Sequence, residues 1–130
     1  MRVLSEEEGR ALQVLIQHIG QMNAVDMGDL YRKVFNAEFK NKINDTRKIR
    51  QIITALRYEG MPIADCSTGY YMAYGSEFLA WKDRRKHKAL KILKMIAPME
   101  SLTVKELLGQ MALNLEGGGN AGKQSKIPGK

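Results

Sequence analysis

The chain has 130 residues, 44% of them apolar and 27% charged, which is enough for a single soluble domain with a hydrophobic core. Its formal net charge of +7 favours a polyanionic partner such as nucleic acid. No run of 18 apolar residues is present, so we expect no membrane span and no membrane partner. Cys66 is the only cysteine, so no intrachain disulfide can form, and no apolar leader follows Met1; both features predict a location in the bacterial cytoplasm or nucleoid.

The positive charge is concentrated in two blocks. Residues 31–60 hold eight basic and three acidic residues, and residues 76–97 hold seven basic and two acidic residues. Residues 1–30 hold two basic and five acidic residues. A charge that served only solubility would not separate in this way, although a solvated helix face could. The two blocks therefore favour a binding surface.

Two helices are predicted in the first third of the chain. Ser5 and Glu8 have the spacing of a capping box, and Gly20 is a natural helix end. The second helix is predicted from Asp26 to Phe35, followed by a loop over residues 36–44. The buried positions are expected at Leu12, Leu15, Ile16 and Ile19 in the first helix, at Leu30, Tyr31, Val34 and Phe35 in the second, and at Phe39 and Ile43 in the loop.

A third helix followed by a hairpin is predicted from residue 45 to residue 74. Asn44 or Asp45 is expected to cap a helix over residues 45–58, and Gly60 to end it. Two strands follow at residues 62–66 and 70–74, joined by Ser67, Thr68 and Gly69, with Gly69 able to take a positive φ. The buried stripe of the third helix is expected at Ile49, Ile52, Ile53 and Leu56.

The last third of the chain is predicted to be helical and then disordered. A long helix is expected over residues 77–97, capped by Ser76 and ended by Pro98, and Thr103 and Glu106 predict a capping box for a last helix. The sequence thus divides into residues 1–75, a helical extension over 76–112 and a glycine-rich tail over 113–130. The fold class is mostly α with a small β-hairpin.

The third helix is expected to turn a basic and polar face to solvent. With 100° between successive residues, the positions opposite the isoleucine stripe are Arg47, Gln51, Thr54 and Tyr58, with Arg50 and Ala55 at the flanks. An arginine fork matches guanine O6 and N7, glutamine matches adenine N6 and N7, and a threonine methyl packs on a thymine methyl. The cations expected to contact phosphates are Lys40, Lys42, Lys48 and Arg57.

The long helix allows three interpretations. Phe78, Trp81, Ala89, Ile92, Leu93 and Ile96 share one of its faces. This face can pack on its own domain, form a homodimer through residues 77–97, or, with the last helix, bind another protein through residues 77–111. Residues 10–19 also resemble residues 88–97, either because amphipathic helices converge on such patterns or because the segment is repeated.

No group of residues predicts catalysis, a metal site or a bound cofactor. His18 and His87 lack the spacing of metal ligands. No nucleophile motif brings serine, histidine and aspartate together, and no glycine-rich phosphate loop precedes a helix. We therefore expect a binding protein and not an enzyme.

Residues 10–75 resemble the winged-helix modules of the biotin-repressor kind and small phage-encoded helix-turn-helix proteins. The resemblance is carried by Leu56-Arg57, Gly60, Pro62-Ile63 and Gly69-Tyr70-Tyr71. It implies a winged helix-turn-helix that binds DNA through the third helix and through the hairpin tip at Ser67 and Thr68. The tip carries no lysine or arginine, and no ligase domain follows the hairpin, so ligase activity is not expected.

The functional expectation is sequence-specific binding of double-stranded DNA with the helix of residues 45–58 in the major groove. Such a protein would serve as a transcription regulator or replication accessory factor of a phage or mobile element. The alternative is a protein-interaction adaptor that has a winged-helix fold. RNA binding ranks third, because Tyr58 and Tyr71 are the only aromatic residues placed to stack on unpaired bases.

Overall fold

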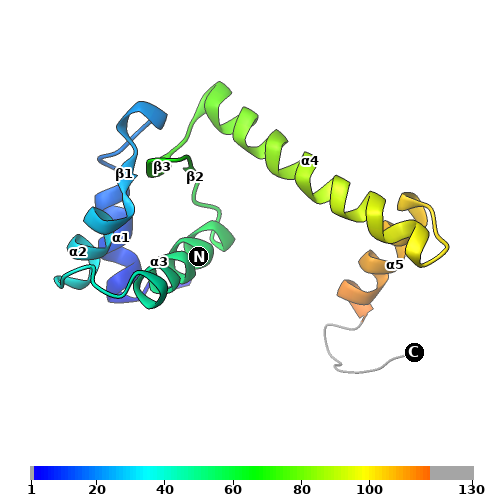
Figure 1. Ribbon diagram of the computed structural model, residues 1–130, viewed down its shortest axis with the longest axis horizontal. Helices are drawn as coiled ribbons and strands as arrows, with labels where there is room; N and C mark the ends of the chain where they lie inside the picture. The colour runs from blue at the N-terminus through cyan, green and yellow to red at the C-terminus, as the bar shows by residue number, and fades with distance from the viewer. Residues whose placement is uncertain (1, 118–130) are drawn as a thin grey trace. The chain divides into compact units, whose positions relative to one another are not determined.

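The computed structural model describes residues 2–117, which form helices and one small antiparallel sheet (Figure 1). Two compact units are present, residues 1–82 and the chain from residue 83 onward. The predicted fold class, mostly α with a small β-hairpin, is confirmed, and a third strand joins the hairpin. The elements are α1 (Glu6–Leu15), η1 (Gln21–Asn23), β1 (Val25–Asp26), α2 (Met27–Phe35), α3 (Lys42–Tyr58), β2 (Ile63–Asp65), β3 (Gly69–Met72), α4 (Gly75–Met99) and α5 (Val104–Gly117).

The start of α1 follows the prediction, but its end does not. The Ser5 hydroxyl accepts the Glu8 N–H at 3.1 Å and the Glu8 carboxylate accepts the Ser5 N–H at 3.0 Å, which completes the capping box. The helix ends at Leu15, so Ile16 and Ile19 are exposed and their predicted burial was wrong.

Residues 16–20 do not continue the helix, because their backbone groups form hydrogen bonds with β3. The His18 carbonyl accepts the Met72 N–H at 2.9 Å, and the Gly20 N–H donates to the Met72 carbonyl at 3.0 Å. A continued α-helix would carry both groups away from the edge of β3. The apolar residues Ile16 and Ile19 keep the periodicity of the helix, although the helix ends at Leu15. The periodicity alone therefore predicts a helix that is too long.

The sheet has the strand order β1-β3-β2, with both pairs antiparallel. Val25 of β1 lies opposite Tyr70, and Ile63 of β2 lies opposite Met72. Gly69 has no positive φ, so the reason predicted for it was wrong. A Cβ at this position would lie 1.9 Å from the Val25 carbonyl oxygen, so glycine is required for the close approach of β1.

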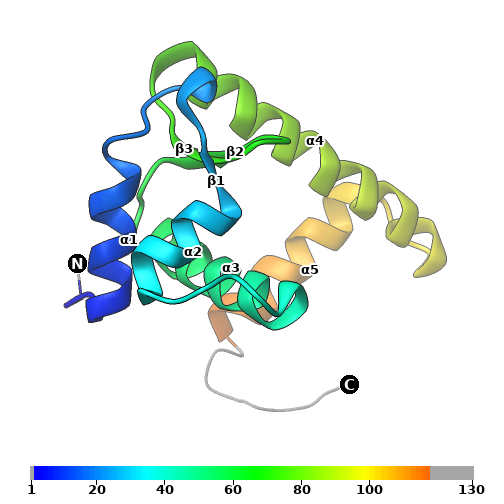
Figure 2. The same ribbon diagram turned by 60° about the vertical axis from the view of Figure 1, so that its left-hand side comes forward.

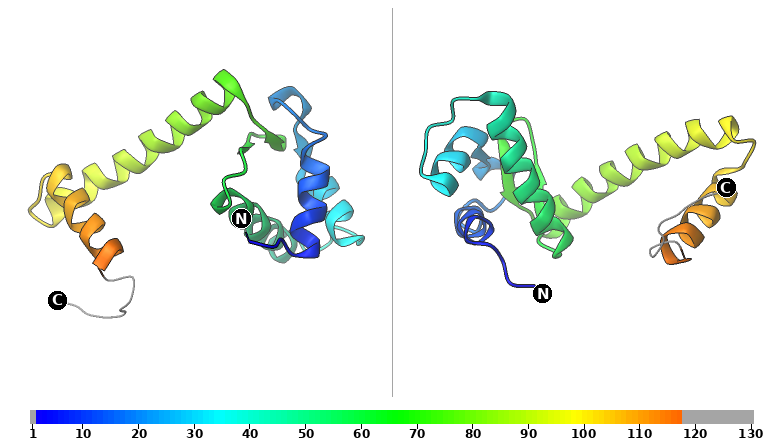
Figure 3. Two further views of the ribbon diagram at one scale, coloured as in Figure 1. Left: turned by 180° about the vertical axis from the view of Figure 1, so that it is seen from behind. Right: turned by 90° about the horizontal axis from the view of Figure 1, so that it is seen from below.

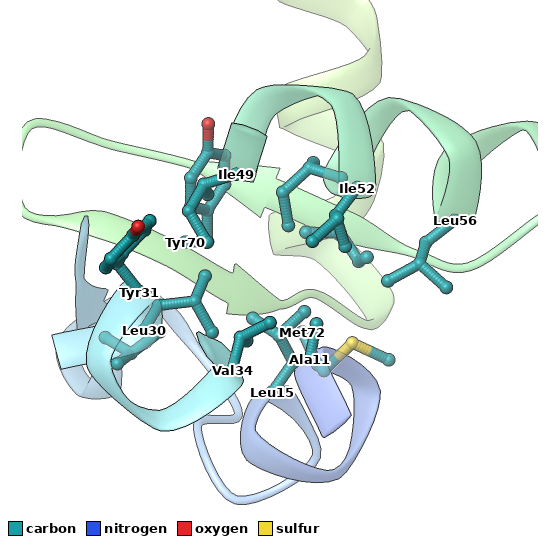
Figure 4. Packing of buried hydrophobic residues seen from close by; sticks show 13 residues of the cluster. Ala11, Leu15, Leu30, Tyr31, Val34, Ile49, Ile52, Leu56, Tyr70 and Met72 are labelled. Atoms are coloured by element: carbon teal, nitrogen blue, oxygen red, sulfur yellow. The ribbon is translucent and has the colours of Figure 1, made fainter. Parts of the chain in front are cut away.

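The hydrophobic core lies between the three helices and one face of this sheet (Figures 2 and 4). The stripe predicted for α3 is buried as expected, and α2 contributes the predicted Leu30, Tyr31 and Val34. Because α3 commits one side to this core, its opposite side faces outward. The buried members of the core are Ala11, Leu15, Val25, Leu30, Tyr31, Val34, Ile49, Ile52, Ile53, Leu56, Ile63, Tyr70 and Met72.

The other face of the sheet is covered by the beginning of α4. Phe78 and Trp81 pack against the buried Ala64, Tyr71 and Ala73. The N-terminal unit therefore includes the first turns of α4 and extends past residue 75, where the sequence placed its boundary. Phe78 and Trp81 belong to the apolar face predicted for the long helix. At these two residues, that face packs on its own domain, which is the first of the three interpretations. The helix also begins at Gly75, before the expected cap Ser76, and continues through Pro98 to Met99.

The start of α3 differs from the prediction by several residues. Asn41 is the N-cap, and its side chain accepts the Asn44 N–H at 3.1 Å. Asp45 is instead buried within the first turn, where its Oδ2 accepts the backbone N–H groups of Lys40 and Asn41 at 3.0 and 3.1 Å. The loop is thus shorter than expected. Phe39 anchors it against Tyr31, whereas Ile43 is 73% exposed and does not.

Removal of the Asp45 carboxylate should destabilise the N-terminal unit. Asp45→Ala leaves two loop N–H groups without an acceptor, so we expect the free energy of unfolding to fall by about 2 to 3 kcal/mol. Asp45→Asn retains an acceptor oxygen and should recover most of this loss. Denaturant titrations of the three proteins measure the difference. Equal losses in both variants would show that the two amides do not depend on this oxygen.

The chain from residue 83 onward contains the rest of α4 and α5, joined by a sharp turn at residues 100–103 (Figure 3). Ser101 has a φ of 59°, and the Leu102 N–H donates to the Ala97 carbonyl at 2.9 Å, which closes α4. The predicted capping box of Thr103 and Glu106 is present. The Glu106 carboxylate accepts the Thr103 N–H, and this hydrogen bond lowers the pKa of Glu106. α5 continues to Gly117, so the tail predicted from residue 113 begins too early; residues 118–130 lie outside the described residues.

Candidate nucleic-acid interface

The outward face of α3 carries the residues that the helical periodicity placed there. Arg47, Gln51 and Thr54 are all exposed, one turn apart along the helix. Within residues 2–117, their side chains make no hydrogen bond or ion pair with the rest of the chain. The guanidinium of Arg47 and the amide of Gln51 are therefore free to meet the edges of bases.

Both ends of α3 are fixed, so this face is presented rigidly. At the C-terminus, the Met61 N–H donates to the Leu56 carbonyl at 3.1 Å and the Gly60 N–H to the Arg57 carbonyl at 2.9 Å. Gly60 has a φ of 90°, the left-handed conformation that this helix ending requires. With Asn41 and Asp45 at the other end, the helix needs little ordering when a ligand binds.

Three lysines surround the N-terminal half of α3. Lys40 and Lys42 are exposed where the helix begins, and Lys48 lies with its ammonium 5.7 Å from the centre of the Phe35 ring. Cations near a helix N-terminus oppose the helix dipole, so they do not stabilise the helix. They do add to its positive potential, which favours an anion such as phosphate.

Arg57 does not belong to this outward surface. Its Nε donates to the Ile63 carbonyl at 2.8 Å, and its guanidinium pairs with Asp65 at 3.1 Å. The same guanidinium lies 4.8 Å from the ring centre of Trp81 and 6.0 Å from that of Tyr70. The predicted phosphate contact of Arg57 does not fit this geometry, because its Nε and Nη2 donate to the hairpin and its guanidinium lies against the Trp81 ring of α4.

Two tyrosines lie near this surface, and one is exposed whereas the other is buried. Tyr58 is 86% exposed at the end of α3. Tyr70 is buried beneath the helix, and burial raises the pKa of its phenol against the opposing charge of Arg57. Arg50 is exposed, and its positive charge also opposes the rise in the pKa of Tyr70. Tyr58 is thus the accessible aromatic ring of this surface.

The hairpin tip projects two small polar residues. Ser67 and Thr68 are exposed, and the Cys66 N–H donates to the Gly69 carbonyl at 2.9 Å across the turn. Their hydroxyl groups can donate to phosphate oxygens, but they add no positive charge. The hairpin tip would therefore contribute less to the affinity for a polyanion than the cations of α3 and of the loop before it.

No helix within residues 2–117 combines the length and apolar content needed to cross a bilayer. Comparisons of the chain with protein-family models, with curated proteins and with solved structures found no match.

Proposed function

We propose that this chain is a winged helix-turn-helix protein that binds double-stranded DNA, with α3 in the major groove. The observation that carries the proposal is the set of Arg47, Gln51 and Thr54, exposed and without partners on a helix whose other side is committed to the core. These three side chains supply the donors, acceptors and methyl group with which proteins distinguish base pairs.

The order of the elements supports the same class of protein. α2 and α3 form a consecutive helix pair, and the hairpin of β2 and β3 follows at once. In winged helix-turn-helix proteins, the second helix of the pair enters the major groove and the hairpin lies beside the flanking backbone. In this arrangement Ser67 and Thr68 would contact the sugar-phosphate backbone of the DNA.

The charge of the surface supports a nucleic-acid partner. Lys40, Lys42, Lys48, Arg47 and Arg50 lie on or beside α3, and Asp45, the acidic residue of its first turn, is buried. Cations in this arrangement attract phosphates and release the counterions of the duplex. We infer that the protein acts in the bacterial cytoplasm or nucleoid, as a regulator or replication accessory factor of a phage or mobile element.

The affinity for duplex DNA should fall steeply with salt. If four of the five cations contact phosphates, the logarithm of the association constant should fall with the logarithm of salt concentration with a slope of about −4. Between 50 and 200 mM salt, the affinity should drop by roughly two orders of magnitude. Fluorescence anisotropy with a duplex selected from a random pool measures both quantities.

A flat salt dependence, or no binding to any selected duplex, would contradict the proposal. It would favour the alternative that the fold serves as a protein-interaction adaptor. Parallel titrations with single-stranded RNA of the same length provide the matched control, because a major-groove reader should bind the DNA duplex more tightly.

A further inference from the structure

The part of α4 from residue 83 onward carries a row of cations along one side. Residues 83–99 hold six basic residues and one acidic residue, Asp83. With about 100° between successive residues, four of the six basic residues fall within an arc of about 120° around the helix. All four are exposed, and we call them the cationic face: Arg84, Lys88, Lys91 and Lys94.

The side of α4 that the protein covers lies opposite the cationic face. Leu93 and Ile96 are half-buried and Ala97 is buried. Helical geometry places these three residues about 180° from the centre of the row of cations. The cationic face is therefore turned outward, just as the isoleucine stripe of α3 turns Arg47 and Gln51 outward.

The cations of this face have no anionic partner within the described part of the chain. None of the four forms a hydrogen bond or an ion pair within residues 2–117, and residues 84–99 contain no acidic residue. Successive members are three or four residues apart, and like charges at this spacing destabilise a helix. The last turn of α4 holds no basic residue, so the helix dipole does not account for the row. A row of one sign, kept at this cost, indicates an anionic partner.

The length of the row matches a stretch of phosphates. Arg84 and Lys94 are ten residues apart, which corresponds to about 15 Å along a helix. A duplex presents one phosphate per strand about every 3.4 Å of its axis, so 15 Å of duplex presents about four phosphates on each strand. Each cation of the row can therefore have a phosphate partner.

An anionic lipid surface fits this helix less well. Helices that lie on a membrane commonly insert Trp or Phe, together with Leu, into the boundary of the acyl chains. The aromatic residues of α4 are Phe78 and Trp81, and both pack against the sheet of the N-terminal unit. Residues 84–99 contain no Trp, Phe or Tyr.

We propose that the cationic face of α4 is a second DNA-binding surface, which contacts the phosphates of a duplex without reading its sequence. The choice of duplex DNA as the partner rests on the function proposed above. Contacts to phosphates add affinity for any sequence, whereas contacts to base edges distinguish one sequence from another. In this division, α3 selects the site and α4 strengthens the complex.

Salt titrations of the full chain with a duplex of arbitrary sequence test the surface. The cations on or beside α3, counted alone, give a slope of about −4, and four further phosphate contacts would steepen it to about −7 or −8. Lys88→Gln combined with Lys91→Gln should make the slope shallower by about two and lower the affinity about 10- to 100-fold at about 100 mM salt. Fluorescence anisotropy measures both quantities. Glutamine and lysine are similar helix formers and both lysines are exposed, so the melting temperature should not change.

Lys86→Gln combined with Lys105→Gln is the matched control. Lys86 lies on α4 outside the cationic face, Lys105 lies on α5, and both are exposed. This pair removes the same two charges from the same unit, but it should change the slope by less than about 0.5. Equal losses in the two double variants would overturn the proposal, because the overall charge of the protein would then account for the binding.

The selected duplex separates this surface from that of α3. Phosphate contacts carry no sequence information, so the double variant at Lys88 and Lys91 should weaken the selected and the arbitrary duplex by the same factor. If α3 does not read DNA, the wild type should show no preference between the duplexes, yet this double variant should still lose affinity. If the cationic face does not bind DNA, the preference should remain and the double variant should bind like the wild type, which would overturn the proposal.

Vesicles of anionic phospholipid test the remaining partner. Cosedimentation of the wild type with the vesicles, lost in the double variant at Lys88 and Lys91, together with no binding to the arbitrary duplex, would overturn the proposal in favour of a lipid surface. Binding to the duplex without cosedimentation would support it.

Discussion

Gly69→Ala should lower the stability of the N-terminal unit more than any other single methyl group added to one of its glycines. The new Cβ would lie 1.9 Å from the carbonyl oxygen of Val25, a backbone atom that cannot rotate away. Either β1 separates from β3 or the hairpin shifts as a whole. We expect a loss of about 3 kcal/mol, at the upper end of the range for overpacking. Thermal unfolding should show a fall in Tm of more than about 10 °C.

Gly9→Ala is the control for this substitution. Gly9 lies within α1, and a Cβ there would meet nothing within 4 Å. Alanine is the better helix former, so this variant should gain about 0.5 to 1 kcal/mol. A Gly69→Ala protein as stable as the wild type would contradict the close approach of β1 to β3.

Arg47→Ala and Gln51→Ala should each weaken binding to the selected duplex about 10- to 100-fold. Each substitution removes a side chain that can make two hydrogen bonds to one base. Neither side chain contacts the core, so the melting temperature should hardly change. Anisotropy titrations on the selected duplex and on a scrambled duplex separate lost specificity from lost charge. Gln51→Ala should reduce the preference for the selected duplex, whereas Lys42→Ala should weaken both complexes equally.

Lys33→Ala and Gln13→Ala are the matched controls for charge and for amide. Both residues are exposed on the helices of the same unit, and both line a hollow between α1 and α2. Neither should change the affinity for the duplex by more than about twofold. Unchanged affinity in both Arg47→Ala and Gln51→Ala would remove α3 from the interface.

The face of α3 could be predicted from sequence because its periodicity is strong. Four isoleucine and leucine positions recur over two turns, and all four are buried. Once they point inward, Arg47, Gln51 and Thr54 must point outward, so helix geometry alone defines the candidate site. The beginning of α3 could not be predicted as well, because Asn41, Asn44 and Asp45 are all good caps. Asp45 differs from the two asparagines in the structure, because its carboxylate accepts hydrogen bonds from two backbone N–H groups of the loop.

Neither the position of the Arg57 side chain nor the strand β1 could be predicted without the three-dimensional structure. Arg57 is held by Asp65 and Trp81, which reach it only after the hairpin returns and α4 begins. β1 has two residues, too few for an alternating pattern. The one local signal is the glycine at position 69, which the sequence pattern equally assigns to a turn. Long-range contacts of this kind leave no periodicity in the sequence.

The most direct measurement is an NMR titration of isotopically labelled protein with the selected duplex. We expect the largest amide shifts within residues 42–58, at Arg47, Gln51 and Thr54, with smaller shifts at Ser67 and Thr68. Binding with the resonances of α3 unchanged, and with shifts confined to residues 83–117, would show that another surface of the chain meets the DNA.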